Sequence, residues 1–198
     1  MIFGAGFVGL VTAACFANNG HDVICIDPDE HKINSINSGR APFYEVGLEA
    51  LIQEGLNCGK LRSQLDSANI NRADVFFIAT GTPTHNGEIN LDQTKEASEA
   101  IGKLISDMDN FPIVAIKSTV VPGTTSNVLS SILEKESGKT AGKDFGLCMN
   151  PEFLREGTAV KDFQNPDRII IGCTDSSTYK IMQSLYSNYM CDFFNTTP

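Results

Sequence analysis

Long apolar runs and basic residues are both scarce in this chain of 198 residues. No apolar run approaches the roughly 20 residues that a membrane-spanning helix needs, so we expect no membrane span. Fifteen lysines and arginines stand against 24 acidic residues, and the net charge is −9. This acidic balance argues against nucleic acid or an anionic membrane as the main partner. A single phosphorylated ligand remains compatible with it, because a local site can hold one.

Paired cysteines are also missing. The six cysteines form no C-x-x-C pair, do not cluster with the three histidines, and mostly lie inside apolar runs. They are Cys15, Cys25, Cys58, Cys148, Cys173 and Cys191. This pattern predicts reduced, buried thiols in a cytoplasmic protein, with neither disulfides nor a metal site. With no internal repeat, low-complexity tract or linker, residues 1–198 are expected to form one domain.

What is present, first of all, is a glycine-rich stretch of the form G-x-G-x-x-G at residues 4–9. The first glycine allows a tight turn, the second lets the backbone approach a pyrophosphate, and the third lets a helix pack closely on a strand. An apolar, helix-compatible run follows at 10–17, and its N-terminus would offer free N–H groups to phosphates. The predicted cofactor-binding residues of this stretch are Gly4, Gly6, Phe7, Val8 and Gly9.

An acidic residue ends the next strand-like run, Val23–Ile26, and completes a βαβ pattern. Asp27 at this position can accept hydrogen bonds from an adenosine ribose, and its charge repels a 2′-phosphate. The pattern therefore predicts NAD as the cofactor in preference to NADP. The alternative is a glycine-rich turn that serves packing alone.

Strands alternate with helices along the rest of the chain, and several strands are continuous apolar runs. Strands are expected at 23–26, 73–79, 113–116, 145–149, 168–172 and 190–194. Helices are expected at 10–17, 28–38, 47–56, 92–107, 124–138 and 176–186. This order predicts an α/β fold with a doubly wound, mostly parallel sheet of the Rossmann type.

Polar segments follow five of the predicted strands, at Gly4, Asp27, Thr80, Ser118 and Asn150. The carboxyl ends of parallel strands share one edge of a sheet, and ligands bind outside that edge. We therefore expect one composite site built from all five segments.

Two carboxylates, Glu152 and Glu156, are four residues apart in the last of these segments. If Asn150 caps a helix and Pro151 takes its first position, both carboxylates lie on one helix face. The apolar neighbours Phe153 and Leu154 would then favour a general base. The alternative is a solvated acidic helix start, relieved by Arg155 and the helix dipole.

Three motifs make the chain resemble the nucleotide-sugar dehydrogenases, with the closest resemblance to the UDP-glucose dehydrogenases. They are Gly4 to Leu10, Lys117-Ser118-Thr119-Val120-Val121-Pro122-Gly123, and Asn150-Pro151-Glu152-Phe153-Leu154-Arg155-Glu156-Gly157 with Asn165-Pro166-Asp167-Arg168. The resemblance runs along the whole chain but covers only the NAD-binding half of that family. It implies oxidation of a sugar C6 alcohol to a carboxylate with two NAD, through a thiohemiacetal and a thioester on a cysteine. It also implies a homodimer or larger assembly when both halves are present.

The resemblance also implies roles for single residues. Thr119 would help to hold the hydrolytic water, Glu156 would act as general base or position that water, and Glu152 would support it. The residues expected to line the sugar pocket are Glu152, Phe153, Leu154, Arg155 and Glu156. The residues expected to bind the cofactor are Asp27 and Lys32 at the ribose, Thr82 or Thr84 at its middle, and Thr119 and Glu156. Taken alone, Thr119 would read equally well as a turn hydroxyl, and Lys32 as a solvated helix lysine.

The chain departs from the family pattern in one respect. The nucleophilic cysteine of the family lies in a Gly-Gly-x-Cys-x-Pro-Lys-Asp stretch, and this sequence contains no Gly-Gly pair. The family's central helix and C-terminal half are likewise missing, so a fragment without activity of its own is expected. UDP-N-acetylmannosamine and GDP-mannose are alternative substrates, although Asn165-Pro166-Asp167-Arg168 favours UDP-glucose. A stand-alone NAD-binding module without catalysis is the alternative of another class, and a downstream cysteine motif in the gene would exclude it.

Overall fold

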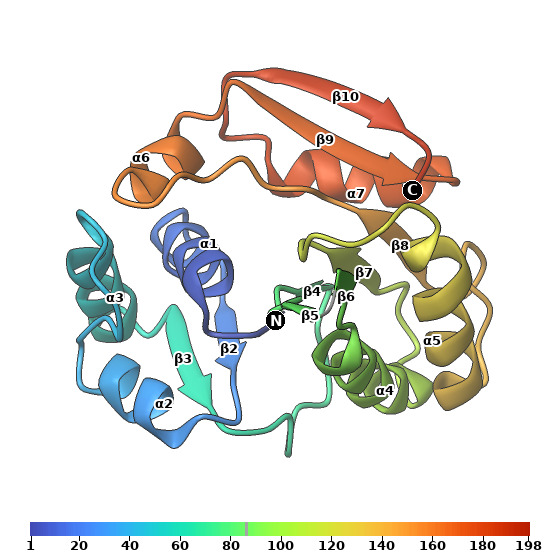
Figure 1. The fold of residues 1–198 in the computed structure, drawn as a ribbon, viewed down its shortest axis with the longest axis horizontal. Coiled ribbons are helices and arrows are strands. Elements are labelled where there is room, and N and C mark those ends of the chain that lie inside the picture. Colours follow the sequence, from blue (N-terminus) through green and yellow to red (C-terminus); the bar gives the residue numbers. More distant parts are fainter. Residues whose placement is uncertain (86) are drawn as a thin grey trace.

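One sheet with helices on both faces forms the body of the molecule in the computed structural model, which describes residues 1–85 and 87–198 (Figure 1). Its strands are β1 (Ile2–Phe3), β2 (Val23–Ile26), β3 (Leu61–Gln64), β4 (Val75–Ile78), β7 (Ile113–Ile116), β8 (Gly146–Met149), β9 (Arg168–Cys173) and β10 (Asp192–Thr196). They lie in the order β10-β9-β8-β7-β4-β1-β2-β3. Neighbouring strands run parallel, except for the antiparallel pair of β8 and β9.

Alternate residues of the central strands supply two hydrophobic cores, one on each face of the sheet. In β7, Ile113 and Ala115 join one core, while Val114 and Ile116 join the other. The helices are α1 (Phe7–Asn18), α2 (Glu30–Asn37), α3 (Leu48–Asn57), α4 (Asp92–Ser106), α5 (Ser130–Ser137), α6 (Ala159–Gln164) and α7 (Ser176–Leu185), and the π-helical segment η1 (Thr124–Leu129) leads into α5. Burial of both strand faces explains why these strands are continuous apolar runs in the sequence.

The order of the strands reverses between β1 and β4, which are hydrogen-bonded neighbours. From this point the chain winds one way through β2 and β3, and the other way through β7 and β8. This is the doubly wound, mostly parallel arrangement of a Rossmann-type domain, so the predicted fold class is confirmed. Such a reversal leaves a crevice at the carboxyl ends of the two strands, where ligands of this fold bind.

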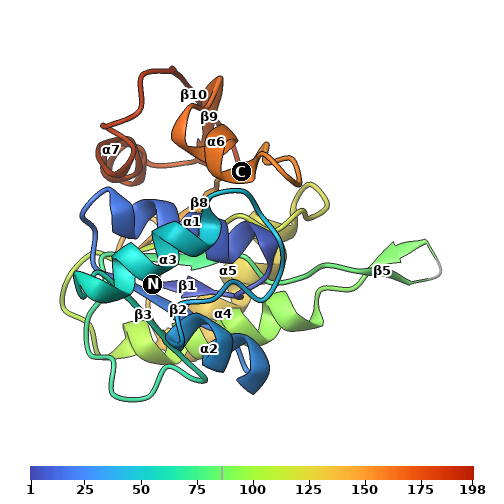
Figure 2. The same ribbon diagram turned by 90° about the vertical axis from the view of Figure 1, so that its left-hand side faces the viewer.

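The structure corrects the sequence prediction in three places. Residues 150–155 are not helical, and the helix of this region is α6, which begins only at Ala159. Strand β3 had not been expected, because Leu61 is the only apolar residue among its four. An unexpected hairpin of β5 (Thr84–His85) and β6 (Glu88–Ile89) projects from the body (Figure 2).

The cysteines are all free, and Cys15, Cys25, Cys148 and Cys173 are buried as expected. Cys58, at the end of α3, is exposed instead. The residues described by the structure contain no group of three or more His, Cys, Asp or Glu side chains that could hold a metal ion. Within the same residues, no helix is both long and apolar enough to cross a bilayer.

The exposure of Cys58 predicts that it is the fastest-reacting thiol of the native protein, ahead of the half-buried Cys191. Burial raises the pKa of Cys15 and of Cys25 to about 12, so these thiols lack both access and thiolate character at neutral pH. Titration with a disulfide reagent should therefore show a fast phase that Cys58→Ser removes, while the buried thiols react only after unfolding. A fast phase that survives in Cys58→Ser would contradict the burial pattern.

Candidate functional site

The glycine turn after β1 is built so tightly that two of its three glycines accept no side chain. Gly4 has a φ of +105°, and a Cβ there would lie 2.5 Å from the carbonyl oxygen of Ala79 at the end of β4. A Cβ on Gly9 would lie 1.9 Å from the carbonyl oxygen of Gly4. The first and third glycines therefore fit the turn and the close helix packing that the sequence predicted for them.

The second glycine faces open space. A Cβ on Gly6 would meet no atom within 4 Å. Gly6 is also the N-cap of α1, and its carbonyl oxygen accepts the first bond of the helix, from the Leu10 N–H at 2.9 Å. The amides of Phe7, Val8 and Gly9 therefore belong to the first turn, where N–H groups lack intrahelical acceptors. With no acidic residue in this turn, the helix N-terminus fits the pyrophosphate of a dinucleotide.

Asp27 lies beside this turn, and its carboxylate is held from three sides. Oδ2 accepts the Ala5 N–H at 2.8 Å and the Lys32 ammonium at 3.1 Å, while Oδ1 accepts the Asp29 N–H at 3.0 Å. A carboxylate has about four acceptor positions, so one remains for a ribose hydroxyl. The structure thus brings Asp27 and Lys32 together as an ion pair, and their role at the ribose stays a prediction.

The two threonines predicted at the middle of the cofactor have different surroundings. The Thr82 hydroxyl donates to the carbonyl oxygen of Thr119 at 2.8 Å and so joins the ends of β4 and β7. Beside this contact, the Ser118 hydroxyl donates to the carbonyl oxygen of Thr80 at 2.7 Å. Thr84 begins the projecting hairpin instead. Of the two alternatives, Thr82 is therefore the residue that the fold joins to Thr119.

Residues 150–157 form the acidic segment, which contains Glu152 and Glu156. A helix would have placed these two glutamates on one face, but the segment does not do so. The Glu152 carboxylate bends back to accept the Leu154 N–H at 2.6 Å, and Glu152 lines a pocket. Glu156 is exposed and does not line that pocket. The helix predicted for this segment is therefore wrong, since residues 150–155 are not helical and the Glu152 carboxylate accepts an N–H two residues further on.

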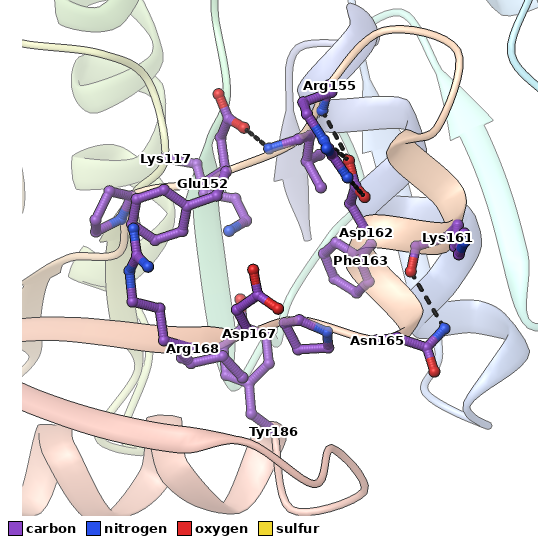
Figure 3. Close-up of a pocket in the computed structure, with 15 residues that line it drawn as sticks. Lys117, Glu152, Arg155, Lys161, Asp162, Phe163, Asn165, Asp167, Arg168 and Tyr186 are labelled. Carbon is purple, nitrogen blue, oxygen red and sulfur yellow. Dashed lines mark hydrogen bonds and ion pairs between the residues drawn. The ribbon is translucent and has the colours of Figure 1, made fainter.

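Arg155 pairs with an aspartate rather than with either glutamate. Its Nε lies 3.0 Å from Asp162 Oδ2 and its Nη2 lies 2.7 Å from Asp162 Oδ1 (Figure 3). The same carboxylate accepts the Arg155 N–H and the Thr158 hydroxyl. The Arg155 hydrogen bonds are the main reason that the pKa of Asp162 falls to about 2. This pair joins the acidic segment to α6.

The pocket lined by Glu152 has a volume of about 440 Å³ and lies between the acidic segment, α6 and the start of β9 (Figure 3). The Arg168 guanidinium lies over the Phe153 ring, 4.5 Å from its centroid. Phe153, Leu154 and Arg155, which were predicted to contact a sugar, all line the pocket together with Glu152. Their roles stay predictions.

A buried polar cluster forms part of the pocket wall. Asn150 Oδ1 accepts the Lys117 ammonium at 3.2 Å and the Tyr186 hydroxyl at 2.6 Å, and Asn150 Nδ2 donates to the carbonyl oxygen of Ile170 at 2.9 Å. The Lys117 ammonium also lies about 6 Å from the ring centroids of Phe77, Phe163 and Tyr186. Burial lowers the pKa of Lys117 to about 8, with a smaller opposing effect from the charge of Glu152.

Sequence reasoning had given no role to Lys117, to Asp162 or to Glu45, whose carboxylate accepts the Gly157 N–H at 2.7 Å. For Lys117 a signal existed, because the lysine directly follows the buried strand β7 and precedes a polar turn. For Asp162 and Glu45 the sequence offered no comparable signal, since their partners depend on the fold.

Comparison with known proteins gives consistent matches. The family model described as the NAD-binding domain of the UDP-glucose/GDP-mannose dehydrogenase family matches residues 1–190. The chain is 46% identical over 187 residues to GDP-mannose 6-dehydrogenase of Pseudomonas syringae pv. tomato, covering 93% of this chain and 43% of that protein. It is 41% identical over 187 residues to a UDP-glucose 6-dehydrogenase of Haloferax volcanii, covering 94% of this chain and 43% of that protein.

A solved structure agrees with these matches. The ternary complex of GDP-mannose dehydrogenase from Pseudomonas aeruginosa superposes with a TM-score of 0.96 at 40% identity, covering 99% of this chain and 45% of that one. The chain thus spans less than half the length of these three relatives.

Proposed function

Because this chain belongs to the UDP-glucose/GDP-mannose dehydrogenase family through its NAD-binding domain, we propose that it is the NAD-binding half of an enzyme that oxidises the C6 alcohol of a nucleotide sugar to a carboxylate. One observation supports this most strongly. The glycine turn, the Asp27–Lys32 pair and the acidic segment with its pocket follow β1, β2 and β8, which all end at the same edge of the sheet. A dinucleotide and a sugar could therefore meet there.

Each part of this edge has a proposed task. NAD, when bound, supplies the hydride acceptor. The amides of Phe7, Val8 and Gly9 bind its pyrophosphate, and Asp27 orients its ribose. Thr119 and Glu156 contact NAD and hold the water that hydrolyses a thioester, and that thioester forms on a cysteine of a further half of the enzyme. Glu152 to Arg155 line the side of the site that receives the sugar.

The substrate we propose is GDP-mannose, with UDP-glucose as the second candidate. Over spans of 187 residues, the relative named for GDP-mannose is 46% identical and the one named for UDP-glucose 41%. The Asn165-Pro166-Asp167-Arg168 motif, which lines the pocket, favours UDP-glucose instead. The test is NADH production by the enzyme with both halves, given each nucleotide sugar in turn. Inactivity with every nucleotide sugar would favour the non-catalytic module.

The cofactor site predicts a clear effect of Asp27. We expect Asp27→Ala to weaken NAD binding by about 1–3 kcal/mol, because a charge-assisted hydrogen bond to the ribose is lost. The measurement is a calorimetric titration of this chain with NAD and with NADP. Asp29→Ala is the matched control, because it removes only the carboxylate that accepts the His31 and Lys32 N–H groups and keeps the backbone N–H that donates to Asp27. Equal affinity of the unmodified chain for both dinucleotides would contradict the prediction.

A further inference from the structure

The loop between α2 and α3 turns an acidic side chain inward, against the usual pattern. Phe43 and Glu45 point into the protein. In contrast, the side chains of Tyr44 and Val46 are 87% and 57% exposed. Glu45 itself is only 5% exposed. Burying a carboxylate while a tyrosine and a valine face solvent costs stability, so the contact that Glu45 makes needs an explanation.

That contact reaches across 112 positions of the chain to the acidic segment. Glu45 Oε2 accepts the Gly157 N–H at 2.7 Å, and Gly157 directly follows Glu156. Gly157 has a φ of +85°, so the segment turns sharply at this residue, where the bond fixes it. Glu45 Oε1 is buried without a hydrogen-bond partner among residues 1–85 and 87–198. Among the described residues, the bond to Gly157 is therefore the one hydrogen bond that offsets the free-energy cost of burying this carboxylate.

The same loop also contacts the glycine turn. The Phe43 ring lies 5.7 Å from the ring of Phe7, the first residue of α1. The N-cap of α3, Gly47, lies close to α6, because a Cβ there would be 3.8 Å from Val160 Cγ1. One short loop therefore touches the N-terminus of α1, the acidic segment and α6.

From these contacts we propose that Glu45 is a positioning residue, which anchors the acidic segment beside the dinucleotide turn and so holds Glu156 ready for the bound cofactor. The inference deepens the proposed function, since it rests on contact between Glu156 and NAD. Glu45 touches neither substrate nor cofactor in this scheme, and it acts through the Gly157 amide alone.

The test measures NAD affinity of this chain by calorimetry, well below its unfolding temperature. We expect Glu45→Ala to weaken NAD binding about 5- to 20-fold, in the usual range for coupling between sites. Glu45→Gln keeps an oxygen that can accept the Gly157 N–H, and it should restore most of the affinity. Glu49→Ala is the matched control, because Glu49 accepts the Ala41 N–H of the same loop at 3.4 Å and leaves the acidic segment untouched. Its affinity should equal that of the unmodified chain.

A second readout separates anchoring from stability alone. Amide hydrogen exchange at Glu156 and Gly157 should accelerate in Glu45→Ala but not in Glu49→Ala. If Glu45→Ala binds NAD as tightly as the control, the proposal is overturned, whatever its unfolding temperature.

A double variant distinguishes this failure from a failure of the proposed function. In Glu156→Ala, addition of Glu45→Ala should weaken NAD binding no further. If Glu156→Ala weakens binding and Glu45→Ala does not, the anchor is wrong and the role of Glu156 stands. If Glu45→Ala weakens binding and Glu156→Ala does not, the anchor acts through another residue of the segment and the role of Glu156 falls.

Discussion

Glu156→Gln in the enzyme with both halves should slow steady-state turnover by about 10²–10⁴-fold, the usual cost of losing a general base. The first turnover should still produce NADH at saturating NAD, because the catalytic task proposed for Glu156 comes after both oxidations. The protein should then stall with the sugar bound covalently to the cysteine of the other half. Stopped-flow absorbance would show the burst, and mass spectrometry of the intact protein would show the adduct.

The geometry makes Glu156→Gln a clean substitution. Glu156 is exposed, so the loss of its charge should leave the unfolding temperature unchanged. Glu152→Gln serves as the comparison, because a glutamine oxygen can still accept the Leu154 N–H that Glu152 holds at 2.6 Å. We expect Glu152→Gln to stall more weakly, in keeping with a supporting role. Normal turnover of Glu156→Gln without a trapped adduct would reduce Glu156 to a solvated surface carboxylate.

The sequence predicted best those elements whose signal is local. Strands β2 and β7 have the bounds that their four-residue apolar runs indicated. The polar segments follow β1, β2, β4, β7 and β8, as expected for one sheet edge. The same reasoning missed β3, whose residues Leu61 to Gln64 carry little apolar pattern and depend on pairing with β2. Pairing between distant segments leaves no mark in a short window of sequence.

The acidic segment shows how a sound local argument fails. Asn150 was expected to cap a helix, but its amide is used by Lys117, Tyr186 and Ile170 from three other parts of the fold. In the alternative interpretation Arg155 would relieve the repulsion between the glutamates, but it forms its ion pair with Asp162 on α6. Tertiary hydrogen bonds thus outweighed the helix signals of Asn150 and Pro151. The hydrogen bond between Glu45 and Gly157 likewise joins distant parts of the chain, so it could not be predicted from the sequence.

Lys117 should give the protein a stability that rises with pH between about 8 and 10.5. Its pKa is lowered from 10.5 to about 8, chiefly by burial. Between these values the unfolded chain binds a proton that the folded chain does not, so the free energy of unfolding increases with pH. Below pH 8 Lys117 is protonated in both the folded and the unfolded state, so this gain in the free energy of unfolding is absent. A shift of this size corresponds to about 3 kcal/mol across the window.

Buried thiols act in the opposite direction and have to be separated from this effect. Cys15 and Cys25 have pKa values raised to about 12 by burial, so the unfolded chain loses their protons first as the pH passes 9. Their contribution to stability is full below pH 9 and falls above it. The pH dependence of the unmodified chain therefore mixes two opposing trends, and only a difference between variants isolates Lys117.

The decisive comparison is with Lys117→Met, whose unbranched side chain is one heavy atom shorter and carries no charge. Urea unfolding at several pH values should show the stability of the unmodified chain rising relative to Lys117→Met by about 3 kcal/mol between pH 8 and 10.5. Tyr186 still donates to Asn150 Oδ1 in this variant, so that oxygen keeps a partner. If the variant fails to fold, NMR of the labelled lysine in the unmodified chain gives the same answer, as a titration near pH 8. Parallel stability curves, or a lysine that titrates near 10.5, would show that the ammonium beside this pocket is not desolvated by the surrounding rings of Phe77, Phe163 and Tyr186.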